Sequence, residues 1–408
     1  MSAAPDLNSS RMRSAGRDML SLALIDSRNH SLRWASLFEP LLSGDASMPQ
    51  SAELSPPLWL LGHVGWFQEY WIARNVQRQR GPACDPTLPR LASVCADADD
   101  WYNPALLLPA ERWQLALPDL QPTKQYLGET IDITLELLGN ADEDDASLHF
   151  FRLALLHEDL HAEAWAEMAQ ALGLSLVSAP GLLADIVTAP PRPALFFPAS
   201  HVQQGSLPHG FVFDNEKWAH DVSVPEFEID SQAVSWAQYA EFVEDGGYDD
   251  GSWWSNEGWA WLQREGRRVP RHVDQMRGGV LQQRFGRLVR APLAQPALHV
   301  SWYEADAWCR WAGRRLPTEV EWEAAALAGA SRGHRWGDVW EWTATTFRPY
   351  PGFSPDPPRE RSQRAFGSHK VVRGASFATP GRLRHPKYRR FEMPQRDDLF
   401  SGFRSCAV

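Results

Sequence analysis

The sequence predicts an α+β protein of two domains, a helical bundle followed by a mixed domain of short strands and helices. Three observations support this fold class. The chain has 408 residues, more than one ordinary hydrophobic core organises. Apolar residues recur at helical spacing through the first 180 positions or so. After a proline-rich segment the pattern changes to short apolar runs separated by glycine, aspartate and proline.

The first domain, placed at residues 10–180, contains four long segments with apolar residues three and four positions apart. These segments are residues 18–42, 57–75, 123–138 and 147–172. Amphipathic helices of this number and length predict an up-down four-helix bundle. Ser55, followed by two prolines, is typical of a helix start and supports the second segment.

An irregular stretch, roughly residues 81–121, joins the second and third helical segments. A connection this long inside a compact domain is either disordered or functional. Its large side chains favour order, and they include Trp101, Tyr102, Leu106 and Trp113. We therefore expect an ordered loop with a functional role.

Residues 181–198 are rich in proline and predict a linker to a second domain at residues 199–408. Within that domain, helical spacing returns at residues 236–244, 302–312 and 318–328. The intervening runs are short and bounded by turn residues, which predicts strands and many loops. The layout is that of an α+β domain.

The composition restricts the class of partner. The formal net charge is −11 and the chain has no long run of lysine and arginine, which argues against nucleic acid or an anionic membrane as the main partner. The local exception is a group of arginines near the C-terminus, which fits either a solvated basic face or a ligand pocket: Arg382, Arg384, Arg389 and Arg390.

The segment types that direct a chain to or across a membrane are not expected. No run of 18 apolar residues is present, and the first 20 residues are too polar for a secretory signal. The four cysteines form no C-x-x-C pair. A reducing cytoplasm is the simplest expectation.

Two histidines in the fourth helical segment have the spacing of metal ligands. His157 and His161 lie one helical turn apart and therefore share a face. The same string fits H-E-x-x-H, the zinc-protease pattern in which Glu158 would be the general base. Glu163 follows two residues after His161, so it points off the metal face and fits a structural or supporting role.

A third histidine, His63, lies in the apolar second segment. There it is either a hydrogen-bonded core residue or a third ligand, because facing helices of a bundle build metal sites in their core. Three neutral imidazoles leave coordination positions open. This donor set suits zinc hydrolysis or non-haem iron oxygen chemistry.

Both halves of the chain resemble one family. The pattern H…H-x-x-x-H-x-E on a bundle resembles the DinB-like domain of the ergothioneine-pathway sulfoxide synthases. The second half resembles a formylglycine-generating-enzyme (sulfatase-modifying factor) domain, a variant of the C-type-lectin fold. Five ordered motifs carry the second resemblance: VSWYEA at 300–305, RLPTEVEWEAA at 315–325, GDVWEWT at 337–343, VRGASF at 372–377 and GFR at 402–404.

The resemblance implies an activity and a cofactor. In this family three histidines bind iron(II), here His63, His157 and His161. The enzymes use O2 to join a sulfur or selenium donor to the imidazole C2 carbon of hercynine, giving a sulfoxide or selenoxide. Open positions on one metal would bring the reactants together in the right orientation.

The sequence departs from the ergothioneine enzymes at three places. Their catalytic tyrosine corresponds to Phe347, although a second tyrosine of the same pattern survives as Tyr350 and becomes our catalytic candidate. A glutamine that contacts the substrate imidazole corresponds to Leu160. Their arginine-rich loop for a γ-glutamylcysteine donor corresponds to an acidic stretch that begins at Asp97.

An acidic, tryptophan-rich loop fits a neutral sugar donor better than an anionic peptide. One branch of the family, selenoneine synthase, uses a selenosugar. The residues from Trp101 to Asp119, from Phe213 to Lys217 and from Lys387 to Glu392 resemble that branch. We therefore expect a selenoneine synthase, with Trp101 and Tyr102 in the substrate site.

The trimethylammonium group of hercynine favours aromatic faces. Tyr350 and Phe391 are the candidates for this contact, with Arg390 and Glu392 as polar neighbours. The expected ligands are thus small molecules: hercynine, a selenosugar or a thiol, with Fe(2+) as cofactor and O2 as co-substrate.

Three alternatives stay open. The first is an ergothioneine-type sulfoxide synthase that joins hercynine to a cysteine-containing thiol. The second is a zinc hydrolase that uses His157, Glu158 and His161. The third is a binding module without catalytic activity, an idea to which the loss of the tyrosine at Phe347 gives weight.

Overall fold

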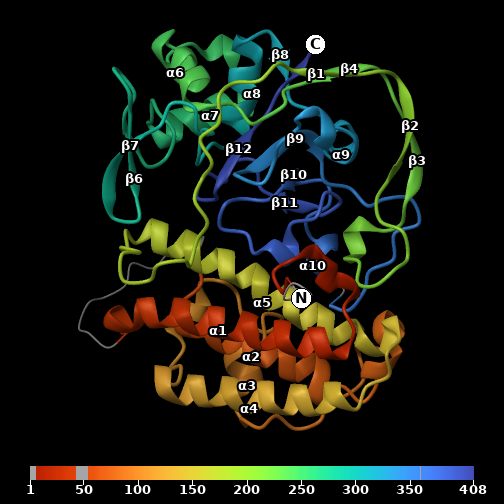
Figure 1. Ribbon diagram of the computed structural model, residues 1–408. Coiled ribbons are helices and arrows are strands. Elements are labelled where there is room, and N and C mark those ends of the chain that lie inside the picture. The colour runs from red at the N-terminus through yellow and green to blue at the C-terminus, as the bar shows by residue number, and fades with distance from the viewer. Residues whose placement is uncertain (1–5, 43–53, 359) are drawn as a thin grey trace, which may run out of the picture.

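The computed structural model describes residues 6–42, 54–358 and 360–408. All four predicted helical segments of the first part form helices. They lie together as a bundle at the base of the molecule in Figure 1: α1 (Arg17–Leu42), α2 (Pro57–Gln68), α4 (Leu120–Gly139) and α5 (Asp145–Ala171). The predicted second segment extends past α2 because a π-helical turn, η2 (Glu69–Ala73), continues it.

Helix α5 positions most of the site. It begins at Asp144, whose carboxylate accepts hydrogen bonds from the backbone N–H groups of Ala146 and Ser147, both at 2.9 Å. The helix is 27 residues long, about 40 Å at 1.5 Å per residue. It lies between the other bundle helices and the second domain (Figure 1), and residues on nearly all its sides are buried.

The stretch between α2 and α4 is ordered and carries short helices: η3 (Arg78–Ala83), α3 (Ala98–Tyr102) and η4 (Glu111–Gln114). Asp99 of α3 forms an ion pair at 2.7 Å with Arg74, the residue that follows η2, and it also accepts from Trp66 Nε1 of α2 at 2.7 Å. The Tyr102 side chain, at the end of α3, is buried. The contacts of Asp99 and the burial of Tyr102 therefore hold the loop against the bundle, whereas Leu106, one of the side chains expected to order it, is exposed.

The second part is α+β. Two four-stranded sheets, with orders β1-β4-β13-β8 and β11-β10-β9-β12, are accompanied by the hairpin β2-β3 and the three-stranded sheet β5-β6-β7. The strands are β1 (Leu195–Phe197), β2 (Ser200–Gln204), β3 (His220–Val224), β4 (Phe227–Ile229), β5 (Val273–Gln275), β6 (Val280–Arg284), β7 (Arg287–Ala291), β8 (Arg314–Arg315), β9 (Trp340–Thr346), β10 (Lys370–Gly374), β11 (Arg390–Glu392), β12 (Ser401–Phe403) and β13 (Cys406–Ala407).

Helices accompany these sheets, three of them at the predicted positions and two, at residues 256–265 and 360–363, that the sequence did not predict. Capping boxes fix the first residues of three of them, through Ser235, Ser301 and Thr318. The helices of this part are α6 (Trp236–Glu244), α7 (Asn256–Glu265), α8 (Trp302–Trp311), α9 (Glu319–Ala328) and α10 (Glu360–Gln363), with the single 3-10 turns η5 (Asp214–Glu216), η6 (Gly251–Trp253), η7 (Ala330–Arg332) and η8 (Gly381–Leu383).

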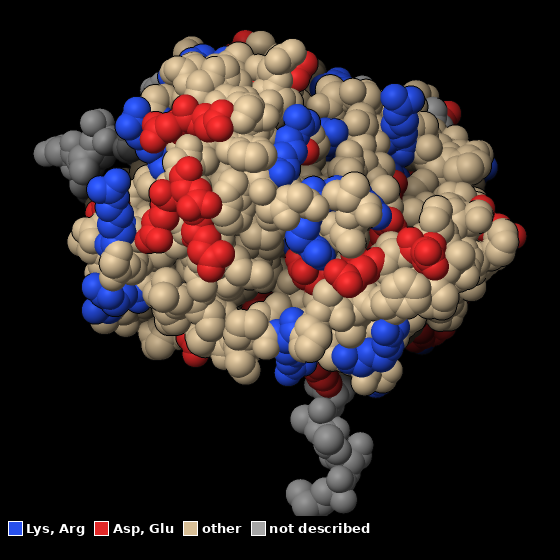
Figure 2. All heavy atoms as spheres, turned by 90° about the horizontal axis from the view of Figure 1, so that it is seen from above, with Lys and Arg blue, Asp and Glu red and all other residues tan. Residues whose placement is uncertain are grey.

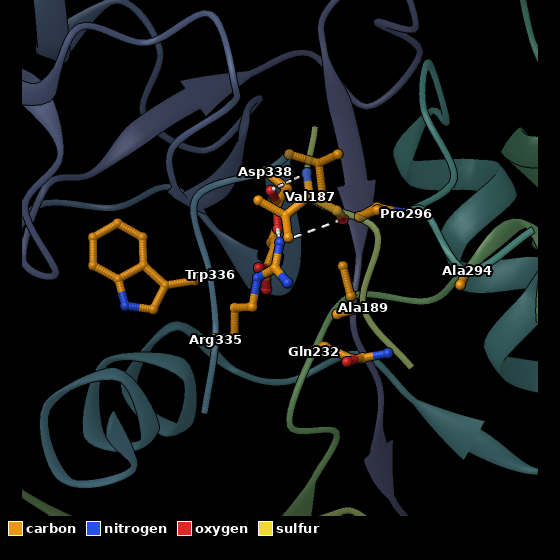
Figure 3. A pocket seen from close by; sticks show the side chains of 11 residues that line it. Val187, Ala189, Gln232, Ala294, Pro296, Arg335, Trp336 and Asp338 are labelled. Carbon is orange, nitrogen blue, oxygen red and sulfur yellow. Dashed lines mark hydrogen bonds and ion pairs between the residues drawn. The ribbon is translucent and has the colours of Figure 1, made fainter. Parts of the chain in front are cut away.

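The proline-rich segment at residues 181–198 is bound to the second domain. Its last residues form β1, which pairs antiparallel with β4. Earlier in the segment, the Val187 N–H donates to Asp338 at 3.2 Å and the Val187 carbonyl accepts from Arg335 at 3.4 Å (Figure 3). The pocket beside these bonds holds only about 10 Å³, room for about one water. It is a packing gap and no substrate site.

Buried ion pairs join the two parts of the chain. Asp159 of α5 accepts two hydrogen bonds from Arg382 of η8, at 2.6 and 2.9 Å, and both side chains are at most 3% exposed. Glu163, on the next turn of α5, accepts from Trp340 Nε1 of β9 at 2.7 Å. The bundle and the second domain therefore share α5 as a common wall.

The surface carries charges of both signs. On the face seen in Figure 2, basic and acidic side chains alternate over a background of other residues. Among the helices of the described residues, we find none that is both long enough and apolar enough to cross a membrane.

Candidate metal centre

Three histidines from two helices meet in the bundle. His63 comes from α2, and His157 and His161 come from α5. One nitrogen of each ring lies within 4.8 Å of the nitrogens of the other two. The ring centroids are 5.1 Å apart for His63 and His157, 5.2 Å for His63 and His161, and 4.3 Å for His157 and His161. The structure thus brings together the three residues that the sequence predicts as ligands.

Backbone carbonyls orient two of these rings. The Nδ1 of His63 lies 2.9 Å from the carbonyl oxygen of Tyr102, and the Nδ1 of His161 lies 2.8 Å from that of His157. A carbonyl only accepts, so each Nδ1 carries the proton and each Nε2 keeps its lone pair. Ligating histidines are held in this way by their other ring nitrogen. The donor set therefore fits a single metal ion.

Aromatic side chains fix the planes of the same rings. Trp59 stacks on His63 with centroids 4.6 Å apart and planes 10° apart, and Phe67 stacks on His157 at 3.5 Å and 5°. Burial lowers the pKa of His63 well below its usual value, and the neighbouring His161 lowers it further. A ring that resists protonation keeps its lone pair for a metal at neutral pH.

The histidines line a cavity of about 960 Å³ that follows α5. Along this helix the lining runs from His149 to Met168, with the predicted ligands in between. The opposite wall comes from the second domain and includes Tyr388 and β11. The volume lies at the upper end of the range of small-ligand sites, about 300–1,000 Å³.

Glu158 does not belong to this cavity. Its carboxylate binds Arg28 of α1, with Nε–Oε1 at 2.9 Å and Nη2–Oε2 at 3.1 Å, and both side chains are buried. The residue next to a ligand on a helix points about 100° away from it. In H-E-x-x-H hydrolases the glutamate must reach a metal-bound water, and here a guanidinium in the bundle interior holds it. This geometry disfavours the zinc-hydrolase alternative.

An acidic group of side chains lines the end of the cavity beyond His161. Arg390 is surrounded there by three carboxylates, with the closest N–O distances 3.4 Å to Glu163, 3.2 Å to Glu167 and 2.8 Å to Glu392. All four residues line the cavity. Burial raises the pKa of Glu167 to about 8, although Arg390 opposes the shift. We call this group the acidic end.

Of the predicted substrate residues, β11 supplies those that reach the cavity: Arg390, Phe391 and Glu392. The prediction for Tyr350, as a catalytic and substrate-binding residue, needs a correction, because its side chain does not line the cavity. It is 6% exposed, its hydroxyl lies 3.4 Å from Glu319, and the Arg389 guanidinium lies over its ring at 3.9 Å. Burial raises its pKa well above the usual value, so Tyr350 stays protonated and structural.

Phe347 packs one layer behind the cavity. It is fully buried and stacks on Phe391, with centroids 4.3 Å apart and planes 16° apart. The phenylalanine therefore supports a ring that lines the cavity and does not itself line it. Leu160, the other departure in the sequence, lines the cavity directly.

The predictions for Trp101 and Tyr102 need a second correction, because neither side chain lines the cavity. Their backbone carbonyls act instead. That of Tyr102 accepts from His63, and that of Trp101 accepts from Trp59 Nε1 at 2.8 Å. The buried Tyr102 ring lies so close to Gly62 that a Cβ there would come within 2.1 Å of it. The loop thus positions a ligand, which composition alone could not indicate.

Sequence reasoning missed several lining residues: Trp59, Phe67, Arg112, His149 and Glu167. Helical phase offered a signal for Phe67, one turn after His63, and for His149 and Glu167, which share the α5 face of Leu160. No local signal marks Arg112, which stacks over Trp59 at 3.9 Å across the loop.

Comparisons with known proteins agree with this architecture. The family model of the sulfatase-modifying factor enzyme 1-like domain matches residues 194–338 and 334–407. The hercynine oxygenase of Mycolicibacterium smegmatis is 33% identical over 86% of this chain and 90% of its own length. That of Mycolicibacterium thermoresistibile is 30% identical over 95% and 94%.

A further relative matches only the second half. The formylglycine-generating enzyme of Streptomyces coelicolor is 32% identical over 32% of this chain and 45% of its own length. The full-length matches include the part that carries the three histidines as well as the part with the sheets. This chain therefore belongs to the hercynine oxygenase family of oxidoreductases.

Proposed function

We propose that the protein joins hercynine to a selenosugar with O2, giving a selenoxide on the way to selenoneine, at one iron(II) ion held by His63, His157 and His161. One observation carries the proposal: three oriented imidazoles open into a cavity at the upper end of the size range of small-ligand sites, in a chain of this family. The histidines would come from a DinB-like bundle, and the second domain would complete the substrate site.

The balance of the reaction fixes what the site must provide. The C2–H of hercynine and the Se–H of the donor are lost, a C–Se bond and an Se–O bond form, and the four electrons reduce one O2 to water and the selenoxide oxygen. Iron(II), when bound, supplies the activation of O2 and a common anchor for the donor. The protein supplies orientation, charge and exclusion of water.

The acidic end suits the acceptor substrate. Phe391 presents a ring and Glu392 presents a carboxylate to the same part of the cavity. A trimethylammonium group gains from an aromatic face and from negative charge nearby. Arg390 is held in place there by ion pairs with three carboxylate side chains, one at each of its guanidinium nitrogens.

The neutral selenosugar donor is supported by two features. Apart from Arg112, the loop residues that line the cavity are uncharged, and Leu160 presents an apolar side chain to it. The alternative is a cysteine-containing thiol, as in ergothioneine-type synthases, and Arg112 favours it. Arg112 lines the cavity and has no carboxylate partner among the described residues, so it could bind a peptide carboxylate.

Anaerobic reconstitution with iron(II) tests the proposal. The loaded protein is mixed with hercynine and either a selenosugar or γ-glutamylcysteine, and O2 uptake and product mass are followed. We expect uptake with the selenosugar and a product that contains selenium. Turnover only with γ-glutamylcysteine would replace the selenium donor by the thiol. Hydrolytic activity with zinc and no O2 uptake would overturn the proposal.

A further inference from the structure

His369 is a lining residue of the cavity to which the proposed function gives no role. It directly precedes β10, and its carbonyl accepts from the Phe347 N–H at 2.7 Å. Its ring meets the Phe391 ring edge-on, with centroids 5.8 Å apart and planes 78° apart. Both His369 and Phe391 line the cavity, so this histidine belongs to the second-domain wall beside the acidic end.

Ser368 engages one ring nitrogen of His369 and leaves the other for a ligand. The Ser368 hydroxyl donates to the Ala365 carbonyl at 3.2 Å, so it accepts from His369 Nδ1, which lies 2.9 Å away. Nε2 has no hydrogen-bond partner among the described residues. The ring is only partly buried and Nε2 is open to solvent, so a ligand in the cavity can reach this nitrogen.

The arginines next to Phe391 on the same wall are already engaged. Arg390 uses each of its guanidinium nitrogens in an ion pair with a carboxylate. Arg389 donates from two nitrogens to Glu319, at 2.8 and 3.0 Å, and from the third to the Asn215 carbonyl at 2.6 Å. A ligand carboxylate beside Phe391 therefore meets no unengaged guanidinium nitrogen of these two residues, and His369 is the neighbouring side chain that can bind it.

The charges around His369 favour a neutral ring until an anion binds. Burial lowers the pKa of His369 below its usual value, Glu392 opposes this shift, and Arg396 adds to it. Lys370, the next residue, donates from Nζ to the Ala344 carbonyl at 3.3 Å. A carboxylate beside Nε2 would raise the pKa of the ring and favour its protonated form, which donates from both nitrogens. Binding of an anion at this place should therefore take up a proton.

We propose that His369 binds the carboxylate of hercynine through Nε2–H and takes up a proton from solvent as it does so. The inference rests on the proposed function and adds a residue that recognises the acceptor substrate. Hercynine carries its trimethylammonium group and its carboxylate on the same carbon. A site that holds the cation against Phe391 and Glu392 therefore needs a donor close by for the anion, and His369 interacts with both of these residues.

Binding of hercynine and of its decarboxylated analogue, trimethylhistamine, tests the contact. The iron(II)-loaded protein is titrated with each compound without O2, by calorimetry at pH 7. We expect His369→Gln to raise the Kd for hercynine about tenfold, as for a lost hydrogen bond to a charged group, and to leave the Kd for trimethylhistamine unchanged. His369→Arg, which keeps a positive charge at every pH of the test, should restore the preference for hercynine.

The pH dependence of hercynine binding provides a second readout. Because the wild-type ring must take up a proton, its affinity for hercynine should fall between pH 6 and 8 relative to that of His369→Arg. Glu167 titrates in both proteins, so its contribution cancels in this comparison. Parallel pH profiles for the two proteins would contradict proton uptake by His369.

The controls separate this inference from the proposed function. Arg364→Gln removes an exposed cation that also lines the cavity and should bind both compounds as wild type does. Unchanged hercynine binding in His369→Gln, an equal loss for both compounds, or equal affinity of wild type for the two would overturn the role of His369 and leave the proposed function intact. Wild-type protein that binds neither compound would overturn the proposed acceptor, and with it this assignment.

Discussion

The two walls of the cavity are built by different means. On the bundle wall, helical spacing sets the positions of His157 and His161, and nearby backbone carbonyls orient the rings. On the second-domain wall, β11 presents Arg390 and Glu392, and the position of Arg390 depends on ion pairs with carboxylates of α5. The cluster of three histidines is therefore a property of the bundle, whereas the acidic end requires that the two domains dock correctly.

Removal of one predicted metal ligand should affect only the site on the bundle side of the cavity. For His157→Ala we expect iron(II) affinity to fall by more than about a hundredfold, because even the partners of metal ligands are worth about 10- to 100-fold. Activity should disappear with the metal. Iron per chain after desalting, measured by mass spectrometry, checks the first expectation and O2 uptake the second. His201→Ala is the matched control, and full iron content in His157→Ala would remove that residue from the ligand set.

Loss of the ion pair between Asp159 of α5 and Arg382 of η8 should weaken the docking of the second domain on the bundle. Asp159→Asn leaves the buried Arg382 without its closest partner, and breaking a buried pair costs about 3–5 kcal/mol. Urea unfolding should show a decrease of about this size, softened by the second partner of Arg382, Asp26. Glu143→Gln, which breaks an exposed pair with Arg17, should leave the curve unchanged.

The iron affinity and the KM of Asp159→Asn test whether the two sides of the cavity depend on different contacts. If docking builds the acidic end, Asp159→Asn should bind iron(II) as wild type does while its KM for hercynine rises. An equal loss of iron and of hercynine affinity would show that the two walls are not separable.

The same difference explains what the sequence could predict. The helices, their caps and the spacing of His157 and His161 are local properties, so they could be predicted from pattern, whereas His63 entered the ligand set only through the resemblance to a known family. The role of Tyr102 was missed because a backbone carbonyl leaves no mark in the sequence. Tyr350 was misplaced because a motif match does not say which layer of the domain faces the cavity, and Arg389 and Glu319 hold it one layer behind.

A glycine tests the link between the loop and the ligand. In Gly62→Ala the new Cβ would lie 2.1 Å from a Tyr102 ring atom, so the ring and its carbonyl must shift. We expect a loss of about 1–3 kcal/mol from overpacking and about tenfold weaker iron(II) binding, since that carbonyl orients His63. Thermal unfolding and iron titration measure these effects.

The matched control for this variant is Gly128→Ala. Position 128 lies inside α4, and no atom lies within 4 Å of the place that the new methyl carbon would take. Alanine is favoured over glycine in a helix by about 1 kcal/mol, so the control should stabilise the protein and bind iron normally. Equal iron affinity in the two alanine variants would refute the role of the loop.

The last test concerns the acidic end, through the pKa of Glu167. In the folded chain burial raises this pKa to about 8, from 4.5 in a solvated carboxyl. The folded state therefore holds a proton that the unfolded state has lost, so the stabilising contribution is complete below pH 4.5 and is lost as the pH rises toward 8. Glu167→Gln is neutral throughout and should lack this part of the pH dependence.

Thermal unfolding between pH 5 and 8 measures the difference. The wild-type Tm should fall relative to that of Glu167→Gln as the pH rises, whereas Glu129→Gln, at an exposed site on α4, should follow the wild type. Parallel curves for wild type and Glu167→Gln would contradict the raised pKa. Hercynine extends the test to the second-domain wall, because a bound trimethylammonium favours the ionised carboxylate. If the acidic end holds this cation, saturating hercynine should move the wild-type transition to lower pH and leave that of Glu167→Gln in place.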